Sequence, residues 1–433
     1  MAILIWLFAW IVVAVPAAAQ PTAAEVERVR SGFERMLREN ILPFWYPQVI
    51  DEEGGGYRLN HDASGAWQGP TDKALVVQAR TLWFFSRLYN AGYGSQEHLQ
   101  AADHGYAFLR DALWDDAFGG FFWAVSANGK VATRPNKHLY GQAFALYALV
   151  EYAQASGRGE VLHMADSLFY LAEEKAHDAA YGGYAEWFRR DWAPGPESDH
   201  YMGVASDVKL MNTHLHLMEA LTTYWELSAD ELARERLLEL ILIQSNAVVR
   251  KGVGACTDQY TRRWKPLLDA PRARVSYGHD VENTWLLATA CRAAGVPNGP
   301  LVDLYRLLVD NALRYGFDHA RGGFYEAGDL GISADDRDKV WWVQAEGLVG
   351  LLSLYQLTGD GAYWDAFIKT YDWIEAHQVD WRGGDWHAEI GIEGRAAGNK
   401  ASAWKSPYHN GRAVLECLAR LENLPSVGAA DGR

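Results

Sequence analysis

The feature that most constrains the fold of this 433-residue chain is an internal repeat. A pair of glycines recurs before an aromatic residue or, in the last copy, before Asp385-Trp386, at Gly55-Gly56-Tyr57, Gly119-Gly120-Phe121, Gly182-Gly183-Tyr184, Gly322-Gly323-Phe324 and Gly383-Gly384. The first glycines are 64, 63, 140 and 61 residues apart. The interval of 140 residues is two periods, and Gly252-Val253-Gly254-Ala255 lies near its middle as a degenerate copy. The chain is therefore predicted to contain six units.

Each unit has two stretches in which apolar residues recur three or four positions apart, the spacing of a buried helix face. Twelve helices are predicted, near residues 24–41, 73–91, 96–113, 135–156, 158–177, 207–229, 231–250, 279–295, 299–316, 338–359, 361–378 and 407–423. Short links alternate with long ones, and the long links carry the Gly-Gly-aromatic segments, whose alternating sequence predicts small β-hairpins. Six helical pairs that close on themselves form an all-α (α/α)6 barrel. The helices that follow the long links form its inner ring, and the pocket is expected at the long-link end.

The N-terminal segment differs from the rest of the chain. Residues 3–15 are almost wholly apolar, and Pro16 and Ala17-Ala18-Ala19 follow. This pattern predicts a secretory signal peptide over residues 1–19, cleavage after Ala19, an exported (periplasmic or secreted) protein and one catalytic barrel over residues 20–433. Because the segment lacks Lys and Arg, an uncleaved anchor is the alternative. No later stretch has the ~18 consecutive apolar residues of a spanning helix, so no stable membrane partner is expected.

Composition narrows the class of ligand. The formal charge is −15 and no block of Lys or Arg occurs, which argues against nucleic acid and anionic membranes as partners. The chain has 19 Trp, 22 Tyr and 15 Phe, which suit stacking on a sugar, although most can equally lie in the core. We expect a small oligosaccharide substrate and a monomer or weak homodimer. Cys256, Cys291 and Cys417 lack metal-ligand spacing.

Two predicted inner helices carry polar residues at helical spacing. His279, Glu282 and Trp285 lie three apart on one face, so a histidine and a carboxylate project together beside an aromatic ring. The alternative is a surface histidine with an acidic residue favoured by the helix dipole. Asn212 and His216 share a face of another helix.

Glu219 lies on that face with them, whereas His214 points elsewhere and is predicted to be a structural histidine. His214 and His216 do not form a zinc site, because side chains two positions apart on a helix diverge.

Three further residues attract attention. Pro407 suits the first position of the last helix and places His409 in the first turn, where its ring can face the lumen or cap the helix. Arg80 and Glu346 are charged residues in strongly apolar helices, and buried charge is costly unless it is paired. Arg80 therefore either forms a structural ion pair or contacts substrate.

Residues 78–86, 212–219, 277–285, 341–346 and above all 404–412 resemble the N-acylglucosamine 2-epimerase superfamily. The last stretch, Trp404-Lys405-Ser406-Pro407-Tyr408-His409-Asn410-Gly411-Arg412, is similar to its cellobiose 2-epimerase branch. The resemblance covers roughly residues 24–423, and the leader is the main departure. It implies that His279 and His409 are the acid/base pair. It further implies that Arg80, Asn212, His216 and Glu282 bind the reacting sugar and that Trp404 stacks on a sugar ring. Trp342 and Glu346, in the resembling stretch 341–346, complete the predicted substrate-binding set.

Physical chemistry favours the same reaction. Inverting carbon 2 of a reducing sugar requires ring opening, loss of the proton beside the aldehyde and its return on the opposite face, which suits two imidazoles. Arg80, Asn212 and His216 can stabilise the enediolate as donors, and Glu282 can orient His279. No metal, nicotinamide or other cofactor is needed, and the glycine-rich stretches do not follow strands of a βαβ unit.

The predicted activity is therefore interconversion of the reducing-end glucose and mannose of a β-1,4-linked disaccharide of the cellobiose type. The first alternative is an aldose–ketose isomerase, which would protonate the same enediolate at carbon 1. The second is a glycoside hydrolase or lyase on the same barrel, although hydrolysis wants two carboxylates across the scissile bond. The third is a non-catalytic binding barrel.

Overall fold

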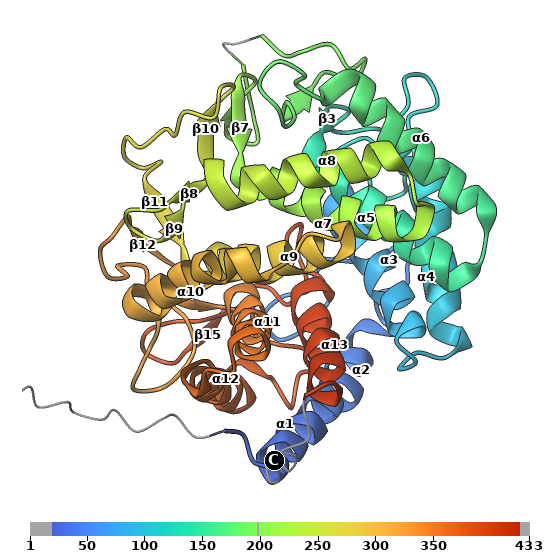
Figure 1. Cartoon of the computed structure of the whole chain (residues 1–433). Helices are drawn as coiled ribbons and strands as arrows, with labels where there is room; N and C mark the ends of the chain where they lie inside the picture. The colour runs from blue at the N-terminus through green and yellow to red at the C-terminus, as the bar shows by residue number, and fades with distance from the viewer. Residues whose placement is uncertain (1–19, 197–198, 425–433) are drawn as a thin grey trace, which may run out of the picture.

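The computed structural model describes residues 20–196 and 199–424 (Figure 1). In this part of the chain the inner ring consists of α3 (Leu75–Asn90), α5 (Leu139–Ser156), α7 (Met211–Ser228), α9 (Tyr277–Ala294), α11 (Trp341–Thr358) and α13 (Tyr408–Glu422). Successive inner helices pack against each other, and α13 packs back on α3, so the ring closes. The predicted signal peptide, residues 1–19, lies outside the described residues.

The outer ring consists of α1 (Ala23–Arg35), α4 (Gln96–Phe108), α6 (Gly159–Ala176), α8 (Glu231–Leu242), α10 (Val302–Gly316) and α12 (Gly361–Trp373). π-Helical turns extend four of them at Met36–Ile41, Leu109–Leu113, Ile243–Ala247 and Ile374–Gln378; the short α2 (Leu42–Trp45) follows the first, and a 3₁₀ turn (Gly299–Leu301) precedes α10. The predicted (α/α)6 barrel is confirmed. Most inner helices begin two to four residues later than predicted, because short strands occupy the ends of the long links.

Those strands join the long links into a second ring. In chain order they are β1 (Lys73–Ala74), β2 (Ala124–Val125), β3 (Lys137–His138), β4 (Trp187–Phe188), β5 (His200–Tyr201), β6 (Val204–Ala205), β7 (Val208–Leu210), β8 (Val249–Arg250), β9 (Ala255–Cys256), β10 (Gln259–Thr261), β11 (Arg274–Ser276), β12 (Ala327–Asp329), β13 (Lys339–Val340), β14 (Glu389–Ile390) and β15 (Ala396–Ala397). The antiparallel pairs β5–β6, β8–β9 and β14–β15 each lie within one link, and β8–β9 encloses the degenerate glycine segment. The intact Gly-Gly-aromatic segments, predicted as hairpins, instead close isolated bridges such as Trp114–Phe121. The pairs β1–β2, β3–β4, β7–β10, β11–β12 and β13–β14 instead connect consecutive links.

The Gly-Gly-aromatic repeat is a buried clamp between a long link and the inner helix that follows it. Gly120 has a φ of +68°, and a Cβ there would lie 2.6 Å from Trp192. The Phe121 N–H donates to Gln142 Oε1 at 2.8 Å, and the Gln142 amide donates back to the Phe121 carbonyl at 2.9 Å. A glycine is therefore required where the chain turns close to its neighbours.

A buried ion pair accompanies the clamp in five units. Its N···O distances range from 2.6 to 3.0 Å, and the pairs are Asp51–Lys73, Asp115–Lys137, Asp178–Lys209, Asp318–Lys339 and Asp380–Lys400. In the third unit His214 takes the place of the glutamine and accepts from the Tyr184 N–H at 2.9 Å, which confirms its structural role. In the degenerate unit Asp280 accepts from the Cys256 N–H at 2.7 Å instead.

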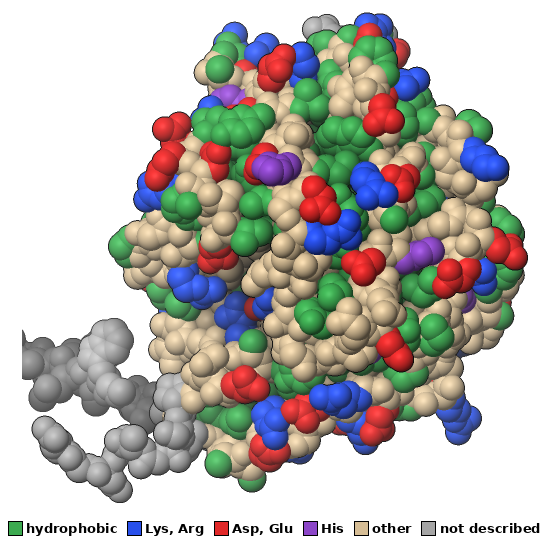
Figure 2. All heavy atoms as spheres, turned by 90° about the vertical axis from the view of Figure 1, so that its right-hand side faces the viewer, with side chains coloured by type: hydrophobic (Ala, Val, Ile, Leu, Met, Phe, Trp, Pro, Cys, Tyr) green, Lys and Arg blue, Asp and Glu red, His purple; other side chains and the backbone are tan. Residues whose placement is uncertain are grey.

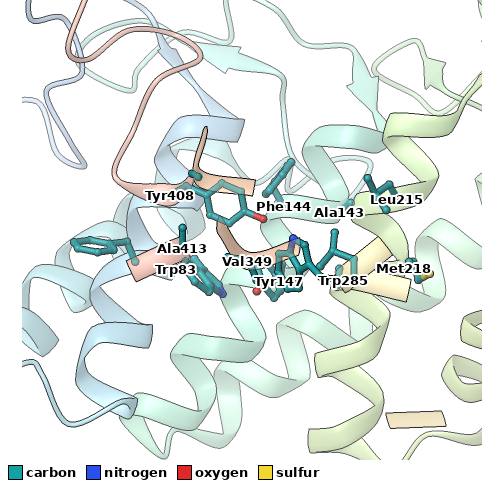
Figure 3. Packing of buried hydrophobic residues seen from close by; sticks show 14 of the residues in the cluster. Trp83, Ala143, Phe144, Tyr147, Leu215, Met218, Trp285, Val349, Tyr408 and Ala413 are labelled. Carbon is teal, nitrogen blue, oxygen red and sulfur yellow. The ribbon is translucent and has the colours of Figure 1, made fainter. Parts of the chain in front are cut away.

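Aromatic packing fills the barrel beneath the long-link end (Figure 3). Trp83 stacks on Tyr147 at 5.2 Å between ring centroids, and Tyr408 meets Trp83 and Phe144 edge-on at 5.3 Å each. Edge-to-face and offset rings at these distances attract each other in addition to burying apolar area. The barrel interior is therefore a packed floor beneath a cavity rather than a pore.

The described chain begins at the end of the barrel opposite the long links. Gln20 donates to the Gly359 carbonyl at 3.0 Å and accepts from the Tyr355 hydroxyl at 2.8 Å, and Gly359 lies in a short link. No helix in the described ranges is long and apolar enough to span a bilayer. On the face turned to the viewer in Figure 2, acidic and basic side chains are interspersed, as their distribution in the sequence suggests.

Candidate active site

A cavity of about 350 Å³ opens at the long-link end of the barrel. Its lining includes eight of the nine predicted site residues, namely Arg80, Asn212, His216, His279, Glu282, Trp342, Trp404 and His409. It also includes residues that were not predicted, Trp123, His138, Tyr140, Met202, Val204, Leu210, Thr213 and Trp341. Because inner helices begin at this end, their first turns present polar side chains to one space.

His279 and His409 reach the cavity from α9 and α13, the two neighbours of α11 in the ring. The Trp342 indole of α11 lies 4.8 Å from the His279 ring and 5.8 Å from the His409 ring, between centroids. Burial, aided by the nearby His216, lowers the pKa of His279 to about 4. Burial and the charges of nearby arginines lower the pKa of His409 well below its usual value. Both imidazoles are therefore neutral at pH 7 and able to accept a proton.

Glu346 is the predicted site residue that does not line the cavity. It is fully buried behind His409 and accepts from His409 Nδ1 at 2.7 Å. It also accepts from Trp285 Nε1 at 3.0 Å and from Arg412 Nη2 at 2.7 Å. Burial raises the pKa of Glu346, but three donors converging on one group, one of them the Arg412 guanidinium, fit a carboxylate. Its place in the structure is that of a positioning residue, which keeps the proton of His409 on Nδ1 and leaves Nε2 free to accept a proton.

Arg412 is the centre of the network beneath the cavity, and it was not among the predicted site residues. The guanidinium contacts Glu219, and its Nη2 donates to Glu282 and Glu346 at 2.7 Å each. Glu282, Glu346 and His409 lie within 4.8 Å of one another, close enough to hold a metal ion. In this structure the positive charge between the two carboxylates is supplied by Arg412.

His216 belongs to the same network through Glu219. Although burial disfavours its charge, Arg412, His216 and Tyr408 lower the pKa of Glu219 to about 2. His216 Nδ1 lies 2.9 Å from Glu219 Oε2, and the Tyr408 hydroxyl donates to Glu219 at 2.7 Å. Because Glu219 is ionised, His216 donates through Nδ1 and presents Nε2 as an acceptor. The neutral ring can thus accept from a sugar hydroxyl, whereas the sequence interpretation assigned it a donor role.

Arg80 is buried without a carboxylate partner among the described residues. Its Nη2 donates to the Tyr140 hydroxyl at 2.9 Å. The guanidinium lies 4.1 Å from the Phe144 ring centroid and 4.8 Å from that of Tyr408. The structural ion pair considered from the sequence is not formed. A cation held by aromatic faces and a hydroxyl remains able to bind an anion in the cavity.

Glu282 does not orient His279 through a hydrogen bond. Its Oε1 accepts from Arg412, while its Oε2 is buried and has no hydrogen-bond partner in the structure. Burial and the neighbouring Glu346 raise the pKa of Glu282 well above its usual value. The unpartnered Oε2 of Glu282 is therefore available for a hydrogen bond to a ligand.

The unpredicted members of the site had weak sequence signals. Arg412 follows His409 by three positions, so both lie on one face of α13, but the partner carboxylates are 66 to 193 residues away. Trp123 and Met202 lie in long links, where the sequence does not define how the chain folds. Trp404, predicted as the stacking residue, is 46% exposed and lies 6.2 Å from Trp123 between ring centroids.

Comparison with known proteins agrees with this geometry. Residues 55–413 match the family model described as N-acylglucosamine 2-epimerase (GlcNAc 2-epimerase). A cellobiose 2-epimerase of Dictyoglomus turgidum is 32% identical over 408 residues, covering 92% of this chain and all of that protein. The solved cellobiose 2-epimerase of Spirochaeta thermophila is 33% identical, with a TM-score of 0.84 over 93% of this chain and 99% of its own.

A D-mannose isomerase of Marinomonas mediterranea is 25% identical over 88% of this chain and 95% of that protein. The residues matched by the family model include both histidines. They identify the chain as a carbohydrate epimerase, which is an isomerase. The chain belongs to the N-acylglucosamine 2-epimerase family.

Proposed function

We propose that this protein epimerises carbon 2 of the reducing-end sugar of a β-1,4-linked disaccharide, interconverting glucose and mannose units. The observation that carries the proposal is the pair of neutral histidines on helices flanking α11, with Trp342 against both rings. The cellobiose 2-epimerases among its relatives support the choice of substrate.

The reaction divides among the cavity residues as follows. Ring opening moves a proton from the anomeric hydroxyl to the ring oxygen. Glu282, the cavity carboxyl group whose pKa is raised, can give a proton to the ring oxygen and take the proton of the anomeric hydroxyl in exchange. One histidine then takes the proton from carbon 2, and the electron pair moves through the new C1–C2 double bond onto the aldehyde oxygen. Arg80 stabilises the resulting enediolate. The other histidine takes up a proton from solvent and donates it to carbon 2 from the opposite face, the aldehyde re-forms, and the first histidine releases its proton to solvent.

The geometry argues against the hydrolase considered from the sequence. Glycoside hydrolysis ordinarily uses two carboxyl groups on opposite sides of the scissile bond. Among the described residues that line the cavity, Glu282 is the only one with a carboxyl group. The aldose–ketose alternative differs only in which carbon of the enediolate is protonated.

Product analysis in D2O tests the proposal. The protein is incubated with cellobiose, mannobiose and mannose, and products are separated by chromatography. The expected product from cellobiose is the glucosylmannose epimer carrying deuterium at carbon 2, because the second base draws its proton from solvent-exchangeable sites. A ketose as the main product would favour the isomerase, and free monosaccharides would favour a hydrolase. An epimer without deuterium would contradict the two-base mechanism.

We further propose that the protein is exported and works as a monomer or weak homodimer. The apolar run over residues 3–15 and the alanines that follow it support export. N-terminal sequencing of the native protein is expected to begin at Gln20, and recovery of Met1 in a membrane fraction would contradict cleavage.

A further inference from the structure

The cavity has two tiers of different chemistry. The inner helices supply the groups that the reaction uses, including Arg80, His279 and His409. The long links supply Trp123, Met202, Val204, Leu210 and Trp404, which are apolar, together with the buried His138. Because the links surround the mouth, this apolar tier lies where the remainder of a longer substrate would leave the reacting sugar.

Met202 occupies an unusual backbone position in that tier. It forms with Gly203 the two-residue turn of the β5–β6 hairpin, in which Tyr201 pairs with Val204. The φ angles of Met202 and Gly203 are +54° and +82°. Two positive φ values are typical of a type I′ turn, where Asn, Asp and Gly are favoured. Methionine is disfavoured at this position because its Cβ crowds the following carbonyl oxygen.

The side chain of Met202 has a defined environment. It lines the cavity, remains 38% exposed, and its sulfur lies 3.8 Å from Arg134 Nη1 of the preceding long link. The hairpin beneath it is fixed, because Trp187 Nε1 donates to the Val204 carbonyl at 3.0 Å. Met202 occupies a strained turn position, and the hairpin directs its side chain at the cavity. A contact between this side chain and the substrate would explain why a methionine is present there.

We propose that Met202 is a substrate-binding residue that packs against the apolar face of the sugar ring following the reacting one. This inference rests on the proposed disaccharide epimerase function and extends it. Met202 and Val204 form one wall of the second-ring site, and Trp123 and Trp404, whose ring centroids are 6.2 Å apart, form another.

The chemistry of this tier defines the substrate class. A thioether and a valine offer no hydrogen-bond donor, and they contact C–H groups of a pyranose through dispersion and burial of apolar area. They do not distinguish an axial from an equatorial hydroxyl. Reducing disaccharides whose second rings differ in hydroxyl configuration, such as cellobiose and lactose, therefore gain the same contact from this wall.

Replacing Met202 tests the inference in a way that separates contact from folding. Met202→Asn suits the turn and removes the apolar contact, whereas Met202→Leu keeps an apolar side chain of similar size. For Met202→Asn we expect KM for cellobiose and for lactose to rise by the same factor, about five- to tenfold, with kcat within about twofold of wild type. Met202→Leu is expected to recover most of that loss. The melting temperature of Met202→Asn is expected to equal or exceed that of wild type.

Ile332→Asn is the matched control, since Ile332 is 61% exposed in another long link and does not line the cavity. It should leave KM and kcat unchanged. The inference is overturned if Met202→Asn keeps wild-type KM, if its loss lies in kcat, or if the losses for the two disaccharides differ by more than about threefold. Wild-type protein that converts neither disaccharide would instead refute the proposed function, and the role of Met202 with it.

Discussion

Replacing Glu346 by glutamine tests whether the buried carboxylate behind His409 contributes to the chemistry. Glu346 Oε1 accepts from His409 Nδ1 and Arg412 Nη2, and its Oε2 accepts from Trp285 Nε1. Glutamine has the same shape but only one acceptor oxygen. If that oxygen faces His409 and Arg412, the amide N–H2 group faces the Trp285 N–H and two donors meet. In the reverse orientation the amide N–H2 group faces the donors of both His409 and Arg412.

The size of the effect follows from these contacts. When His409 takes a proton from carbon 2 it becomes a cation 2.7 Å from the carboxylate, and that charge-assisted bond is lost in Glu346→Gln. A hydrogen bond to a charged group contributes roughly 1.5–3 kcal/mol, so kcat should fall about 12- to 150-fold. The unsatisfied Trp285 donor should lower the free energy of unfolding by roughly 1–3 kcal/mol.

The assay follows exchange of the carbon 2 proton with D2O by NMR, starting separately from each epimer. Exchange of the epimer whose hydrogen faces His409 should slow more than exchange of the other, because only one base is affected. Glu186→Gln is the matched control: burial raises the pKa of Glu186 to about 8, so its carboxyl group is largely neutral at pH 7 already. The reasoning is refuted if Glu346→Gln turns over within threefold of wild type, or if Glu186→Gln loses as much.

Three further predictions concern buried titratable groups. Because the pKa of His279 is lowered to about 4, kcat/KM should stay constant as the pH falls through 6.5 and should decline only near pH 4. Initial rates are measured at pH values where fluorescence shows that the protein is folded. A loss of kcat/KM centred at pH 6.5 would contradict this prediction. Asp115→Asn should lower the free energy of unfolding by about 3–5 kcal/mol in denaturant titrations, because it leaves the buried Lys137 without its carboxylate; a change below 1 kcal/mol would show that the pair contributes little. EDTA is expected to leave turnover intact, since Arg412 supplies the charge between Glu282 and Glu346; loss reversed by one divalent ion would overturn that assignment.

The sequence predicted the barrel well because its repeat is local. Each Gly-Gly-aromatic copy and each helical stretch can be recognised within a few dozen residues, and even the degenerate copy at 252–255 forms the expected hairpin. The buried ion pairs, such as Asp51 with Lys73, escaped notice because each joins the two ends of a long link whose path the sequence does not define.

The candidate site was predicted less completely, for a different physical reason. The family resemblance, which the motif around His409 carries most strongly, implied the acid/base pair, and the structure brings His279 and His409 into one cavity. Arg412 contacts Glu219 across 193 residues, and only closure of the ring brings the two together. Glu346 was recognised as a buried charge, but whether it contacts substrate or supports His409 depends on a side-chain position that spacing alone does not determine.

The attachment of Gln20 to the short link at Gly359 has a practical consequence for orientation. The described C-terminal end lies at the same pole, since the Arg420 carbonyl near the end of α13 accepts from Gln356 at 3.0 Å. Tethering the protein to a bead, an electrode or a lipid bilayer through Gln20 or the last turn of α13 would therefore direct the opening of the cavity away from the support. A membrane anchor joined to the chain ahead of Gln20 would hold the barrel with its cavity facing away from the bilayer, accessible to dissolved sugars.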